Sequence, residues 1–85
     1  MHDTFLNQNL YESINHLCKE NAIAKILNLT ITVHTDSHIS EESIREHFAD
    51  RKSGHIGDWT NILVQKREIE PLTAAIDQIE GEKLS

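Results

Sequence analysis

The sequence predicts a single α+β domain in which two helices pack on one face of a small mixed β-sheet. Three patterns lead to this fold class. Apolar residues recur every three or four positions near the N-terminus, apolar and polar residues alternate in the next segment, and a second helical segment follows a capping residue. Amphipathic helices and half-polar strands each need a partner surface, so the helices and the sheet should cover one another.

The chain length limits the organisation to one domain, which we assign to residues 1–85. Eighty-five residues can bury one hydrophobic core but not two. Only four side chains are Phe, Trp or Tyr, so the core must be mainly aliphatic. The lone cysteine, Cys18, can form no disulfide within the chain, and we interpret it as a small buried hydrophobe.

The first helix is expected from about Phe5 to Glu20. Its apolar face is predicted to consist of Leu6, Leu10, Ile14 and Leu17. The following strand is the clearest in the sequence. Its buried face is predicted to consist of Leu27, Leu29, Ile31 and Val33, which alternate with polar residues up to His34.

A second helix is expected from Glu41 to about Asp50. Ser40 is its predicted N-cap, and the acidic residues that follow suit the positive end of the helix dipole. Ile44 and Phe48 are predicted to face inward. A glycine-containing loop over residues 52–58 should then lead into a strand from about Thr60 to Ile69.

The tail is ambiguous from its local pattern. Residues 72–80 fit a helix that begins with Pro71 and ends at Gly81, and they equally fit a short strand and turn.

Charge and hydropathy favour a cytoplasmic, non-catalytic protein that binds neither nucleic acid nor membranes. The net charge of -6 opposes binding to a phosphate backbone. No apolar stretch has the length of a membrane span, and the N-terminus lacks the features of a signal peptide. Motifs for nucleophilic, zinc-dependent or phosphate-binding catalysis are missing from the sequence.

Histidine is abundant, and two segments are candidate metal sites. At the N-terminus, the Met1 amine, the His2 backbone amide and the His2 imidazole can supply nitrogen ligands for square-planar Ni(II) or Cu(II). The second candidate is the run His34, Asp36 and His38, whose side chains would share a face only if the strand continued through them. From the residues alone, solvated polar side chains are the commoner outcome for both segments.

In the order of its elements the sequence resembles the HypA family, which supplies nickel to hydrogenase and urease. The pieces that carry the resemblance are the triplet Met1-His2-Asp3, the amphipathic segment Leu6 to Cys18, the strand Leu27 to Val33, the serine-bearing turn Ser37 to Ile44, and Phe48. Together they cover about two-thirds of the chain. The resemblance implies nickel binding by Met1, His2 and Asp3, and delivery of the metal with a maturation GTPase to a nickel-enzyme precursor.

The resemblance breaks at the zinc knuckle of that family. Ile69 to Ala75 resembles the run into the knuckle, but Asp77 to Gly81 stands where its first cysteine pair belongs. A structural zinc needs four ligands, so we expect no structural zinc here. The family's final strand should also be missing. We therefore favour a strand for the tail, and a shortened sheet whose exposed edge could pair in a homodimer.

Two alternatives to a nickel-binding accessory protein remain open from the sequence. One is a degenerate HypA-like interaction or regulatory module that binds no metal. The other is a Zn(II) or Cu(II) buffer that uses His34, Asp36 and His38.

Overall fold

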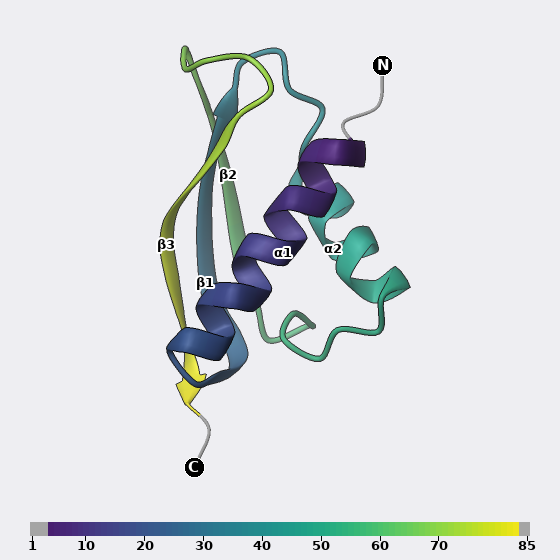
Figure 1. Cartoon of the computed structure of the whole chain (residues 1–85), viewed down its shortest axis with the longest axis vertical. Coiled ribbons are helices and arrows are strands. Elements are labelled where there is room, and N and C mark those ends of the chain that lie inside the picture. The colour runs from purple at the N-terminus through teal and green to yellow at the C-terminus, as the bar shows by residue number, and fades with distance from the viewer. Residues whose placement is uncertain (1–3, 84–85) are drawn as a thin grey trace.

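The computed structural model describes residues 4–83 and confirms the predicted α+β class. Two helices and three strands follow one another in the order α1 (Thr4–Glu20), β1 (Ile23–His34), α2 (Glu41–Asp50), β2 (Asn61–Arg67) and β3 (Ala74–Lys83). The strands form one mixed sheet in the order β2-β1-β3, with β2 parallel and β3 antiparallel to β1. Both helices lie on the same side of this sheet (Figure 1). The helix α2 serves as the crossover that a parallel pair of strands requires.

The core lies between the helices and the sheet and is aliphatic except for one aromatic ring, as the composition predicted. Its buried members are Leu6, Leu10, Ile14, Cys18, Ile23, Ile26, Leu29, Ile31, Val33, Ile39, Ile44, Phe48 and Ile56. Half-buried residues of β2 and β3, among them Ile62, Val64 and Ile76, complete the core at its margins.

The buried face of α1 follows a spacing of four residues throughout. Leu6, Leu10 and Ile14 are buried as predicted, but the next buried residue is Cys18, whereas Leu17 is only half-buried. The assignment of Leu17 to the buried face was therefore wrong. A spacing of four traces a row that is inclined to the helix axis, so α1 contacts the core along an oblique ridge. The interpretation of Cys18 as a small buried hydrophobe is confirmed.

The strand β1 begins four residues earlier than predicted. Its alternation of buried and exposed residues is also interrupted along the strand. Leu29, Ile31 and Val33 are buried as expected, but Ile26 is buried in place of Leu27. The pairing of β1 with β3 shifts its register between Ile26 and Asn28. Such an irregularity interrupts the period of two, because every residue beyond it turns to the other face.

The N-terminus of α2 is capped as the sequence predicted. The Ser43 N–H donates to Ser40 Oγ over 3.1 Å, and the Ser40 N–H donates to Ser43 Oγ over 2.9 Å. This reciprocal pair is a capping box in which serine replaces the usual Glu or Gln. Ile44 and Phe48 are buried, which confirms the predicted inward face of α2.

The tail forms a strand, so the helical alternative that began with Pro71 was wrong. The strand β3 starts at Ala74, after the turn that contains Pro71, and pairs with β1 from Val33 back to Ile23. The sheet therefore has a third strand, formed by the tail for which we favoured a strand. The predicted strand from Thr60 to Ile69 is confirmed over the shorter range of β2.

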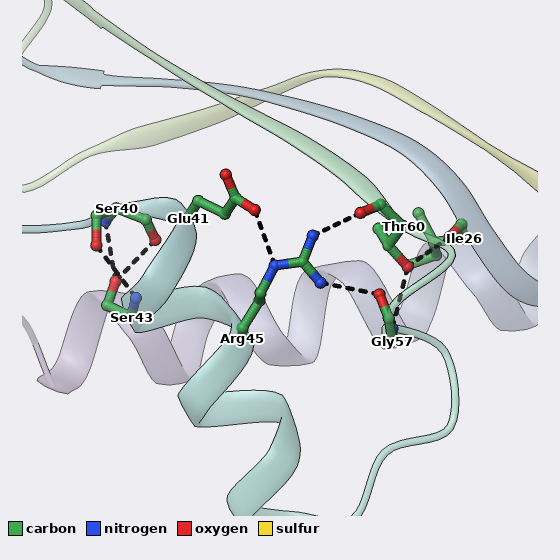
Figure 2. Close-up of polar contacts among 7 residues, drawn as sticks. All are labelled: Ile26, Ser40, Glu41, Ser43, Arg45, Gly57 and Thr60. Carbon is green, nitrogen blue, oxygen red and sulfur yellow. Dashed lines mark hydrogen bonds and ion pairs between the residues drawn. The ribbon is translucent and has the colours of Figure 1, made fainter.

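One arginine ties α2 to the connection that precedes β2 (Figure 2). Arg45 donates to the carbonyl oxygens of Gly57 over 2.8 Å and Thr60 over 2.5 Å, and it forms an ion pair with Glu41 at 2.9 Å. The Thr60 hydroxyl in turn donates to the Ile26 carbonyl over 2.7 Å. These contacts join α2, the connection and β1, and they set the distance between α2 and the start of β2.

Candidate functional site

The first candidate metal segment, Met1, His2 and Asp3, lies outside the described residues. The described chain begins with α1 at Thr4, directly after this triplet. The first turn of α1 lies at the same end of the molecule as the connection between β1 and α2 (Figure 1). That connection carries the second candidate segment, His34, Asp36 and His38.

The second candidate segment is a turn and not a continuation of β1. The Asp36 N–H donates to His34 Nδ1 over 3.1 Å, so this ring nitrogen already serves as a hydrogen-bond acceptor. The Asp36 carboxylate is 93% exposed and lies 4.0 Å from the same Nδ1 atom. Within residues 4–83, no three or more His, Cys, Asp or Glu side chains gather in a way that could hold a metal ion.

The other histidines and Cys18 make contacts of their own. His55 Nδ1 lies 3.1 Å from the Ala24 carbonyl and joins the 51–60 connection to β1. His16 forms an exposed pair with Glu20 one turn later in α1. Burial raises the pKa of the Cys18 thiol, so the thiolate form that binds metals is disfavoured.

His47 makes a contact between the two helices that sequence reasoning missed. Its Nε2 lies 3.0 Å from Gln8 Oε1, and its ring packs edge-on against the Tyr11 ring at a centroid distance of 5.6 Å. Burial lowers the pKa of His47, and the nearby Arg51 lowers it further, while Asp50 opposes the shift. Pairs between separate helices leave no periodic signal in the sequence, so only the packing reveals this one.

The lowered pKa of His47 predicts a loss of stability in weak acid. The unfolded chain binds a proton at His47 more readily than the folded chain, so the free energy of unfolding should fall as the pH drops below about 6.5. Urea unfolding from neutral pH downward should show a shallower decline for His47→Gln than for the wild type. Equal slopes for the two proteins would contradict the role given to His47.

A groove between α2 and the free edge of β2 was also not foreseen. Its lining consists of Ile39, Ser40, Glu41, Ile62, Leu63, Val64 and Lys66. The Leu63 side chain is 54% exposed, although it lies within a strand. The signal was present in the sequence, because three consecutive apolar residues in a strand must turn at least one side chain away from the core.

The sheet face opposite the helices is polar. Thr32 is buried there, and its hydroxyl is shared between the Gln65 and Asp77 side chains. A hollow beside these residues is also lined by Arg67. The lining also includes Thr30, so the hollow presents two threonine hydroxyls, the Asp77 carboxylate and the Arg67 guanidinium.

Comparisons with known proteins place this chain in no family. No family model matches it, and neither a curated protein nor a solved structure matches it. Across residues 4–83, neither helix has the length and apolar character needed to cross a membrane.

Proposed function

We propose that this chain is a non-catalytic nickel-binding accessory protein of the HypA type. The observation that carries the proposal is the joint order of the Met1-His2-Asp3 triplet, the amphipathic helix, the apolar strand and the serine-capped second helix that ends near Phe48. The start of α1 at Thr4 supports it, because the triplet then directly precedes a rigid element.

The chemistry proposed at the triplet needs only its own atoms. The Met1 amine, the deprotonated His2 amide and the His2 imidazole are nitrogen ligands that suit square-planar Ni(II). Asp3 supplies a carboxylate beside them, with a shorter reach than the glutamate of the family pattern. The metal is cargo in this proposal, and it would pass to a nickel-enzyme precursor with the help of a maturation GTPase.

The proposal is tested by titrating Ni(II) into untagged protein with an authentic Met1, followed by calorimetry and absorbance. We expect tight binding with the absorption band of square-planar Ni(II), and loss of both in His2→Ala. An extension of two residues before Met1 should have the same effect, because it moves the free amine away from His2.

His38→Ala is the matched control, since it removes an imidazole from the 35–40 connection and leaves the triplet intact. It should bind Ni(II) as the wild type does. An unchanged affinity of His2→Ala for Ni(II) would contradict the proposal. Loss of binding only in His38→Ala would instead favour the metal buffer that uses His34, Asp36 and His38.

A second candidate function is a HypA-like interaction module that binds no metal. The exposed Leu63 and the groove beside β2 favour it, because an apolar strand edge is a surface on which other strands can pair. This candidate requires that neither the wild type nor the variants bind Ni(II), and that an N-terminal extension leaves function unchanged.

A further inference from the structure

Within residues 4–83, no strand pairs with the outer side of β2, which is an edge of the sheet. Its other side pairs with β1, and the Thr35 N–H donates to the Arg67 carbonyl at the end of this ladder over 3.1 Å. Backbone groups alternate along a strand, so the odd-numbered residues of β2 point to β1 and the even-numbered residues point away. The N–H and C=O groups of Ile62, Val64 and Lys66 are therefore directed outward.

Exposed apolar side chains gather at this edge. Among residues 6–83, the large apolar side chains that are exposed belong to Trp59, Leu63 and Leu72. Leu63 lies in β2, and Trp59 lies two residues before the start of β2. Ile62 and Val64, on either side of Leu63, are half-buried. Covering this edge would remove exposed apolar surface of Leu63 from water.

The opposite edge of the sheet is protected in the ways that natural edge strands are. The pairing of β3 with β1 contains three register shifts. The strand β3 also carries Asp77, Glu80, Glu82 and Lys83. Irregular pairing and charged side chains both discourage the addition of a further strand, and β2 between Asn61 and Gln65 has neither.

We infer that two copies of this chain pair through β2 in an antiparallel arrangement centred on Leu63. The sequence around this residue is self-complementary, because Ile62 then lies opposite Val64 of the partner subunit. Leu63 faces Leu63 of the partner subunit, and Asn61 faces Gln65 of the partner subunit. The outward groups of Ile62 and Val64 receive hydrogen-bond partners, and the two three-stranded sheets become one six-stranded sheet.

The charges of β2 agree with antiparallel self-pairing. The only charged residues of β2 are Lys66 and Arg67, both at its C-terminal end. Lys66 of one copy would lie about 20 Å from Lys66 of the partner subunit, since six positions at about 3.3 Å separate them. This distance exceeds the Debye length of about 8 Å at physiological ionic strength.

The inference is independent of nickel, because no residue of the triplet takes part in it. The first test is light scattering after size-exclusion chromatography over a wide range of protein concentration. We expect a dimer that dissociates on dilution, because a pair of short strands buries less surface than a permanent interface does. Leu63→Lys should be monomeric at every concentration.

Leu72→Lys is the matched control, because it makes the same chemical change at an exposed leucine in the β2–β3 turn. It should dimerise as the wild type does. A wild type that stays monomeric at all concentrations would overturn the inference, and so would equal dimerisation of the two lysine variants.

Cysteine cross-linking tests the register. Leu63 pairs with its own copy at a position without mutual hydrogen bonds, where Cα atoms lie about 4.5 Å apart, within the range of about 4.4–6.8 Å that a disulfide spans. Oxidised Leu63→Cys should therefore form a covalent dimer. Gln65→Cys should remain uncrosslinked, because in this register it faces Asn61 of the partner subunit. The native Cys18 is buried and does not compete. Cross-linking at 65 but not at 63 would overturn the proposed pairing.

Discussion

Phe48→Ala is expected to lower the free energy of unfolding by about 3–5 kcal/mol. The Phe48 ring is 2% exposed and is the largest fully buried side chain of the core. It packs edge-on against the Tyr11 ring at a centroid distance of 4.9 Å and so joins α2 to α1. Removing it loses buried apolar surface and leaves a cavity. Because domains of this size are stable by only about 5–15 kcal/mol, this loss would be a large part of the fold's stability.

Urea unfolding followed by circular dichroism measures this effect. Phe48→Leu is the matched control, since it keeps most of the apolar volume and removes only the ring contact with Tyr11, and it should lose less than half as much. A loss below about 1 kcal/mol in Phe48→Ala would show that the helices do not depend on this ring.

Gly81→Ala is the second substitution with a large expected effect. A methyl group at Gly81 would lie 2.1 Å from the Lys25 carbonyl oxygen and 2.7 Å from Ile23 Cγ2. The oxygen belongs to the backbone of the neighbouring strand, so no change of rotamer relieves the clash. The strands β1 and β3 would have to separate locally, at a cost near the upper end of about 1–3 kcal/mol.

Gly54→Ala provides the comparison, because a methyl group there would have no atom within 4 Å. This variant should keep the wild-type urea midpoint or raise it slightly, since alanine restricts the unfolded chain. Similar midpoints for the two alanine variants would contradict the close approach between Gly81 and β1.

The sequence predicted the two helices well because their signals are local. The period of four in α1 and the Ser40 cap of α2 depend on neighbours within one or two turns, and both are present in the structure. In β1, the alternation of buried and exposed residues was predicted correctly only after the register shift between Ile26 and Asn28. That irregularity depends on how β3 pairs with β1, and such pairing leaves no trace in the residues of β1 alone.

The tail and the edge strand β2 were harder to predict from the sequence for a related reason. Residues 72–80 fit both the helical and the extended pattern, and only the pairing of this segment with β1 decides for a strand. Leu63 was assigned to a strand, but its exposure follows from its pairing with Thr30, which places its side chain on the sheet face opposite the helices. For the candidate metal segments, the sequence predicted donor atoms; the structure adds that His34 Nδ1 already accepts a hydrogen bond.

The contacts of Arg45 have a consequence for the motions of the molecule. A connection of ten residues with two glycines would ordinarily fluctuate on a timescale of nanoseconds to microseconds. Here the guanidinium holds the Gly57 and Thr60 carbonyls, and the Ile26 N–H donates to the His55 carbonyl over 2.8 Å. The connection can therefore open only when α2 and β1 also separate, so the three segments exchange their amide protons with solvent as one cooperative unit.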